Sequence, residues 1–114
     1  MVHWGRDINV QTLSNARDEG VELTLLDVRE DDEFALCAID GALHIPMQEV
    51  PRRIPDLPRN QPLVVMCHHG GRSDQVAQFL RGHGFTNVHN LEGGIDSWAL
   101  MVAVSYTHLT LPTI

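Results

Sequence analysis

The stretch LVVMCHHGGRS, residues 63–73, decides the fold that the sequence predicts. Its first five residues are apolar without polar alternation, which suits a strand buried on both faces of a parallel sheet. Two glycines follow, and from Ser73 to Gly82 apolar residues recur at helical spacing. The stretch therefore predicts a strand, a tight loop and an amphipathic helix in succession.

Strands and helices alternate on both sides of this stretch. Short apolar segments predict further strands over residues 23–28 and 87–91, and helices are predicted over residues 9–19 and 95–100. Prolines recur between residues 46 and 62 and predict turns with short helical pieces. The alternation predicts an α/β fold, with a central, mostly parallel sheet flanked by helices on both faces.

Length and charge limit the class of protein. The chain has 114 residues, 43% of them hydrophobic, which is enough for the core of a single domain. Eight basic and 15 acidic side chains give a net charge of −7, which argues against a nucleic-acid partner and against an anionic membrane. Every basic side chain is arginine, so Schiff-base chemistry on a lysine is excluded.

The two ends of the sequence lead to separate expectations. No apolar run resembles a signal peptide or the ~20 residues of a membrane span, so we expect a cytoplasmic protein. We expect residues 1–100 to form the domain. Residues 101–114 carry no charge and three threonines, and they resemble the read-through or adapter-derived ends of truncated sequences. Whether this atypical tail is native stays open at this point.

Cys67 is the candidate nucleophile. A side chain at the carboxyl end of a parallel strand points into the crevice where α/β proteins bind ligands. Gly70 and Gly71 permit a tight loop whose amide N–H groups converge on an anion, and the next helix adds the positive end of its dipole. A thiol in such a cradle, close to Arg72, ionises more readily than a free thiol. The alternative is a strand cysteine that packs as a small hydrophobe.

Several short motifs together resemble one family. The segments are LLDVRE (25–30), IDGALHIP (39–46), VVMCHHGGRS (64–73) and LEGGIDSW (91–98). In this order they closely resemble the single-domain rhodanese-like sulfurtransferases, from about Ile8 to Trp98. The resemblance implies a rhodanese-like α/β domain that transfers a sulfane sulfur, with no metal and no organic cofactor.

The resemblance also implies roles for the loop. Cys67 would carry the sulfur as a persulfide, after its thiolate attacks the outer sulfur of a donor such as thiosulfate and sulfite leaves. The donor would be a small sulfur-containing anion or a protein persulfide, and the acceptor a thiol or a cyanide-like nucleophile. The substrate-binding cradle would consist of His68, His69, Gly70, Gly71, Arg72 and Ser73.

Two interpretations stay open for the charged residues around the loop. Asp27 and Arg29, at the end of the neighbouring strand, either support the mouth of the loop or form a structural ion pair. Arg72 either meets the substrate or holds the loop through a carboxylate such as Asp27 or Glu33, and we favour the second. The glycines of LEGG and the indole of Trp98 are expected to be structural.

The remaining candidate ligands are the two histidines and the second cysteine. His68 and His69 could donate hydrogen bonds to an anion or could simply be exposed. A metal site on Cys67 and both histidines is disfavoured, because adjacent side chains on one tight loop diverge. Cys37 lies in an apolar segment, residues 34–39, so we expect it to be buried rather than to act as a resolving partner.

Two alternative functions remain beside sulfur transfer. Related phosphatases and arsenate reductases bind an oxyanion above a similar cysteine loop, but their loop is one residue longer than the segment from His68 to Arg72. A non-catalytic interaction module would keep the fold without the chemistry. The presence of Cys67, both glycines and Arg72 argues against that module.

Overall fold

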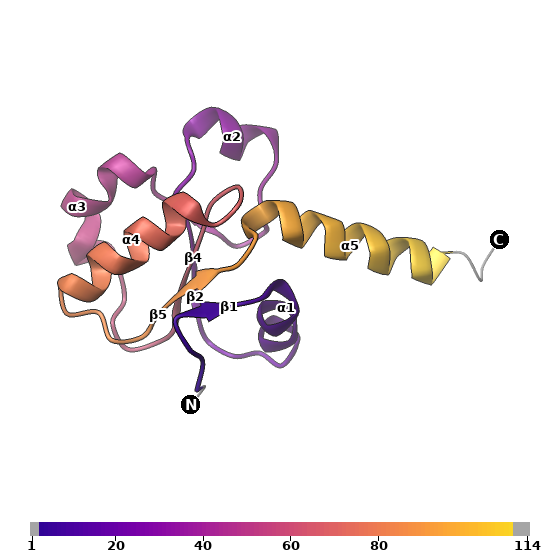
Figure 1. Cartoon of the computed structure of the whole chain (residues 1–114), viewed down its shortest axis with the longest axis horizontal. Coiled ribbons are helices and arrows are strands. Elements are labelled where there is room, and N and C mark those ends of the chain that lie inside the picture. The colour runs from indigo at the N-terminus through magenta and orange to yellow at the C-terminus, as the bar shows by residue number, and fades with distance from the viewer. Residues whose placement is uncertain (1–2, 111–114) are drawn as a thin grey trace.

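The computed structural model describes residues 3–110, with side chains described as far as Val104 (Figure 1). The strands are β1 (Asp7–Ile8), β2 (Thr24–Asp27), β3 (Leu43–His44), β4 (Leu63–Met66) and β5 (Val88–Leu91). The helices are α1 (Val10–Asp18), α2 (Asp31–Leu36), α3 (Val50–Arg53), α4 (Gly71–Gly82) and α5 (Gly94–Thr110), with 3-10 helices η1 (Met47–Glu49) and η2 (Ile54–Asp56). Within residues 3–110 no helix is both long enough and apolar enough to cross a membrane.

The sheet confirms the predicted fold class. Its strands lie in the order β1-β5-β4-β2-β3, and each neighbouring pair is parallel. The three apolar runs form β2, β4 and β5, as predicted. The edge strands β1 and β3 were not predicted, because two residues are too few to carry a periodic pattern.

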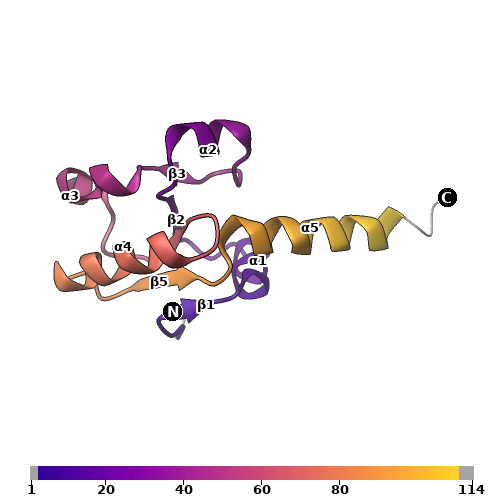
Figure 2. The same cartoon turned by 45° about the horizontal axis from the view of Figure 1, so that its top comes forward.

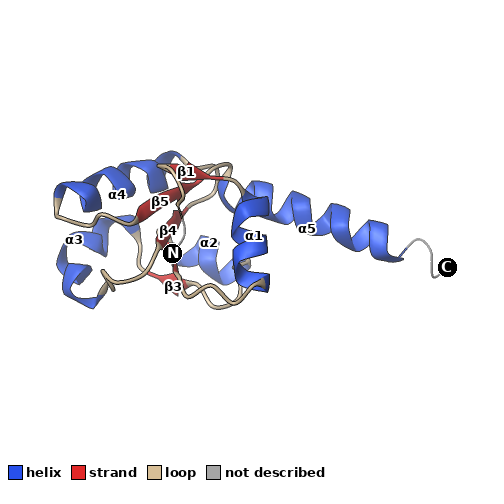
Figure 3. Ribbon diagram, turned by 90° about the horizontal axis from the view of Figure 1, so that it is seen from below, coloured by secondary structure: helices blue, strands red, loops and turns tan. Residues whose placement is uncertain are grey.

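Side chains of β4 alternate between two cores. Leu63 and Val65 lie in the cluster beneath α3 and α4, whereas Val64 and Met66 lie in the cluster beneath α1 and α5. Both faces are therefore buried, as parallel sheets require. Figure 3 shows α3 and α4 on one side of the strands and α1 and α5 on the other. Cys67 continues the alternation and lies in the cluster beneath α4.

The predicted helices occur within two residues of their expected bounds, except that the last one is much longer. The proline-rich segment forms η1, α3 and η2, in agreement with the expected short helical pieces. The final helix was expected over residues 95–100, but α5 continues to Thr110 and projects from the rest of the chain (Figure 1). The tail proposed from composition begins inside this helix, and residues 111–114 of that tail lie outside the described residues.

Candidate functional site

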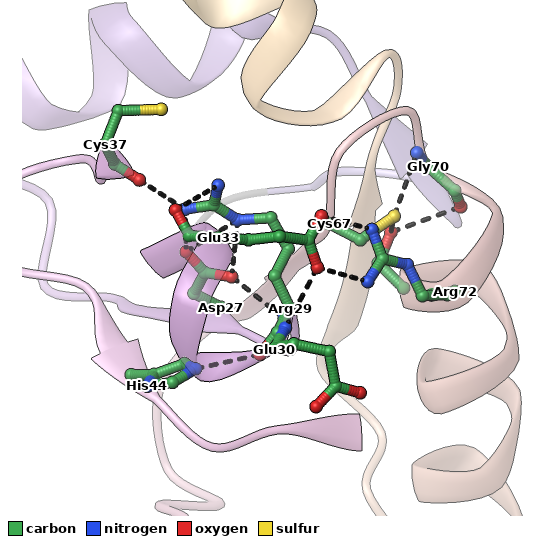
Figure 4. Close-up of polar contacts among 10 residues, drawn as sticks. Asp27, Arg29, Glu30, Glu33, Cys37, His44, Cys67, Gly70 and Arg72 are labelled. Carbon is green, nitrogen blue, oxygen red and sulfur yellow. Dashed lines mark hydrogen bonds and ion pairs between the residues drawn. The ribbon is translucent and has the colours of Figure 1, made fainter. Parts of the chain in front are cut away.

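The loop between β4 and α4 wraps around the sulfur of Cys67. Gly70, at the turn into α4, has a φ of +113°, a conformation that other residues rarely adopt. In this conformation its backbone N–H donates a hydrogen bond to Cys67 Sγ, at 3.0 Å (Figure 4). The hydroxyl of Ser73, in the first turn of α4, lies 3.3 Å from the same sulfur.

These donors determine the ionisation of the thiol. Cys67 is only 1% exposed, and burial by itself raises the pKa of a thiol. The Ser73 hydroxyl and the backbone N–H groups of Ser73, Gly70 and His69 stabilise the anion, and they outweigh burial, so the pKa of Cys67 is lowered. The loop therefore holds a thiol that ionises more readily than a free thiol, in a largely water-excluded site.

Arg72 joins the loop to α2. Its guanidinium donates to both oxygens of the Glu33 carboxylate, at 2.7 and 2.9 Å (Figure 4). Such bidentate pairs have both strength and a defined geometry. Glu33 also accepts a hydrogen bond from the backbone N–H of Glu30 at the start of α2. Of the two carboxylates considered from the sequence, Arg72 therefore pairs with Glu33 and not with Asp27.

The Arg72 pair predicts a pH-dependent contribution to stability. Its hydrogen bonds lower the pKa of Glu33 from 4.5 to about 2, against a smaller opposing effect of burial. The carboxylate therefore stabilises the fold at neutral pH, and this contribution declines as the pH falls through 4.5 towards 2. We expect Glu33→Gln, which keeps an acceptor for the Glu30 N–H, to cost about 1 kcal/mol at pH 7.

Urea unfolding of wild type and Glu33→Gln at a series of pH values measures this contribution. The difference in unfolding free energy between the two proteins should be full near neutral pH and should shrink in acid. A difference that stays constant down to about pH 3 would show that the charge of Glu33 plays no part. Glu49→Gln, at a half-buried carboxylate with a looser arginine contact, serves as the control.

Asp27 and Arg29 form a buried ion pair away from the sulfur. Their side chains are 0% and 3% exposed, and Arg29 Nη2 lies 2.7 Å from Asp27 Oδ2. Arg29 also donates to the carbonyls of Glu33 and Cys37, at 3.3 and 2.8 Å, and so holds the middle and the C-terminal end of α2. Of the two interpretations left open, the structural ion pair is the one observed.

The expected burial of Cys37 is wrong. This residue is exposed, because it ends the short helix α2, which buries none of its own residues. Its carbonyl oxygen accepts from Arg29, and in Figure 4 Cys37 lies at the upper left, whereas the Cys67 sulfur lies right of the centre, beside Gly70 and Arg72. The apolar residues around Cys37 predicted a position in the core, but α2 does not bury this segment.

The start of α5 holds the other side of the loop. The backbone N–H groups of Ile95 and Asp96 donate to the carbonyls of Cys67 and His68, at 2.9 and 3.1 Å. Loop carbonyls thus point to α5, while loop N–H groups point to the sulfur. A Cβ atom at Gly94 would lie 2.2 Å from the Cys67 carbonyl oxygen, so only glycine permits this approach. The loop and the start of α5 lie side by side in Figures 1 and 2.

The rings of His68 and His69 point outward. Both residues are exposed, and their rings stack with centroids 3.9 Å apart. The Nδ1 atom of His69 lies 3.9 Å from an Asp96 carboxylate oxygen. Of these two residues, the backbone N–H of His69 is the group that supports the Cys67 thiolate.

Asn90 contacts the site although it is not among the residues expected from the sequence. This buried residue of β5 lies with its Oδ1 2.5 Å from the Ser73 hydroxyl. The register of β5 beside β4 sets Asn90 opposite Val65, close to the carboxyl end of β4. The only signal in the sequence was a polar pair, His89 and Asn90, between two apolar residues of a short predicted strand.

The chain is similar in sequence to a family model and to proteins named for sulfur transfer or sulfur carriage. Residues 9–101 match the family model described as "Rhodanese-like domain". The chain is 33% identical over 91 residues to "Thiosulfate sulfurtransferase GlpE" of Ectopseudomonas mendocina, covering 80% of this chain and 82% of that protein. It is 34% identical over 92 residues to "Putative sulfur carrier protein YrkF" of Bacillus subtilis, covering 81% of this chain and spanning 50% of that protein.

A solved structure shares the fold. The crystal structure of a rhodanese-related protein from Thermoplasma volcanium superposes with a TM-score of 0.77 at 34% sequence identity. The match covers 85% of this chain and 93% of that one. The sheet with its flanking helices is therefore an arrangement that an experimentally determined protein also adopts.

Proposed function

The chain belongs to the rhodanese-like domain family, and we propose that it is a sulfurtransferase that carries a sulfane sulfur as a persulfide on Cys67. One observation carries this proposal. The sulfur of Cys67 is surrounded by one hydroxyl and several backbone N–H groups, all of which stabilise an anion at that atom. Persulfide formation needs a thiolate, and the persulfide in turn places a terminal sulfur anion near the same donors.

The first half-reaction charges Cys67. Its thiolate attacks the outer sulfur of the donor, the Sγ–S bond forms as the sulfur–sulfur bond of thiosulfate breaks, and sulfite leaves with the bonding electron pair. A donor with an unhindered terminal sulfur suits this step, because Cys67 is only 1% exposed. The name of the Ectopseudomonas mendocina relative supports thiosulfate as the first donor to test, with a protein persulfide as the alternative.

The second half-reaction restores the enzyme. A thiolate or cyanide attacks the outer sulfur, and Cys67 departs as a thiolate stabilised by its hydrogen-bond donors. Neither half-reaction requires a metal, an organic cofactor or a protein acid, because every leaving group is already a stable anion. The reaction therefore suits a site built from one thiol, one hydroxyl and backbone donors.

The surrounding residues have different tasks in this proposal. Gly70 and Ser73 supply donors directly to the sulfur. Arg72 keeps the loop in place through Glu33, whose carboxylate already balances the guanidinium charge before any substrate arrives. The other residues of the cradle contribute backbone groups or line its opening. They are His68, His69 and Gly71. Asp27 and Arg29 support the loop indirectly, by holding α2.

Two-substrate kinetics test the proposal. With thiosulfate as donor and cyanide or a dithiol as acceptor, a persulfide intermediate gives ping-pong kinetics, with parallel double-reciprocal plots. A phosphatase would instead hydrolyse an aryl phosphate and would show no sulfur transfer. An interaction module would show neither activity. Intersecting plots, or turnover of the phosphate ester alone, would contradict the persulfide mechanism.

A further inference from the structure

The hydroxyl of Ser73 lies among three acceptors. This residue is fully buried, and its Oγ is 2.5 Å from Asn90 Oδ1, 3.1 Å from the Gly70 carbonyl oxygen and 3.3 Å from Cys67 Sγ. A serine hydroxyl has a single proton to donate. It can therefore serve only one of these acceptors at a time.

The two acceptors that compete for the Ser73 proton are the Asn90 amide oxygen and the Cys67 sulfur. The Gly70 carbonyl also accepts the backbone N–H of Asp74, at 3.0 Å, and as a neutral acceptor it offers the hydroxyl the same alternative whether or not Cys67 is ionised. The side chain of Asn90 is oriented by Asp7, whose carboxylate lies 3.2 Å from the Asn90 amide nitrogen. A carboxylate accepts and cannot donate, so this contact directs the amide nitrogen to Asp7 and the amide oxygen to Ser73.

We propose that Asn90 is a positioning residue that competes with the Cys67 sulfur for the proton of the Ser73 hydroxyl. When Cys67 is a neutral thiol, the hydroxyl donates to Asn90, and its lone pairs face the sulfur. When Cys67 becomes an anion, charge makes the sulfur the stronger acceptor, and the hydroxyl turns towards it. When the hydroxyl rotates to donate to the thiolate, it gives up its hydrogen bond to Asn90. Asn90 therefore reduces the net stabilisation that the hydroxyl gives to the thiolate. This inference deepens the proposed function, since it concerns the thiolate on which that function rests.

Charged groups on several elements also face this part of the loop. Arg72 belongs to the loop and Glu33 pairs with it from α2, with Glu30 nearby. Asp96 of α5 lies beside His69. On the other side, a cavity of about 550 Å³ is lined by Arg6, Asp7, Asp74 and Glu92 together with Asn90 and loop residues. None of these groups gains or loses charge by substitution when Asn90 or Ser73 is replaced by an uncharged residue. Replacing Asn90 also removes its hydrogen bond to Asp7, so the double variant with Ser73 is needed to isolate the contact with the Ser73 hydroxyl.

Alkylation of the thiol by iodoacetamide at a series of pH values reads out the ionisation of Cys67 without any sulfur donor. All variants carry Cys37→Ser, because the exposed Cys37 would otherwise react as well. Asn90→Leu removes the competing acceptor with little change of shape, and we expect the midpoint pH of alkylation to fall by about half a unit. Ser73→Ala removes the donor, and the midpoint should rise by about one unit.

The double variant decides whether Asn90 acts through Ser73. In the Ser73→Ala background, Asn90→Leu should no longer move the midpoint. Asn90→Val, whose branched side chain suits a strand, gives the same test if the leucine variant does not fold by circular dichroism. A midpoint that stays unchanged or rises on removing Asn90, or one that still falls without Ser73, would overturn the inference. If the midpoints shift as predicted but the parent protein transfers no sulfur from thiosulfate, the proposed function alone is refuted.

Discussion

Serine in place of Cys67 will abolish sulfur transfer from thiosulfate to cyanide, with a loss of about a thousandfold or more. A serine hydroxyl stays neutral at physiological pH and cannot form a sulfur–sulfur bond, so the first half-reaction has no nucleophile. The fold should remain, because the hydroxyl can still accept from the Gly70 N–H and the substitution leaves no large cavity. Initial rates of thiocyanate formation, with circular dichroism of the same sample, measure both effects.

Cys37→Ser is the matched control for this experiment. Cys37 is exposed and lies away from the loop, so the variant should keep nearly the full rate. Substantial turnover by Cys67→Ser would refute the nucleophile assignment. A folded but inactive Cys37→Ser protein would require a mechanism with two cysteines.

Alanine in place of Gly94 will damage both stability and activity. Its Cβ would lie 2.2 Å from the Cys67 carbonyl oxygen and 2.6 Å from the His68 carbonyl oxygen, both of them backbone atoms that must move. We expect a loss of about 3 kcal/mol in unfolding free energy, from this overlap and from the positive φ of Gly94. A shift of the loop by about 1 Å would lower the rate about a hundredfold.

Gly20→Ala separates the overlap from the backbone strain. Gly20 also has a positive φ, at +75°, but a Cβ there meets nothing within 4 Å. This control should lose about 1 kcal/mol and keep its sulfurtransferase rate. Urea unfolding and initial rates of both variants provide the comparison. Equal stability losses, or an unchanged rate in Gly94→Ala, would show that contact with α5 does not hold the loop.

The sequence was sufficient to predict the centre of the site. An apolar run, two glycines and an amphipathic helix place Cys67 at the end of a buried strand, because buried parallel strands and helix starts have local signatures. The motifs around them were sufficient to predict the family. The same reasoning restricted the partner of Arg72 to two carboxylates but could not choose between them, because the choice depends on how α2 packs.

Other features depend on contacts between distant segments. The packing of α5 against the loop brings Gly94 into contact with Cys67, and the register of β5 brings Asn90 into contact with Ser73. Neither contact leaves a periodic pattern in the sequence. The burial of Cys37 was predicted wrongly for a related reason, since an apolar segment does not reveal whether a core lies beneath it.

The mass of the peptide that contains Cys67, after treatment with thiosulfate and removal of the excess, tests the central claim most directly. We expect a gain of one sulfur atom on that peptide, lost again when a dithiol or cyanide is added, and no such gain in Cys67→Ser. A peptide of unchanged mass in a folded protein that still transfers sulfur, or a sulfur carried on Cys37 instead, would contradict it.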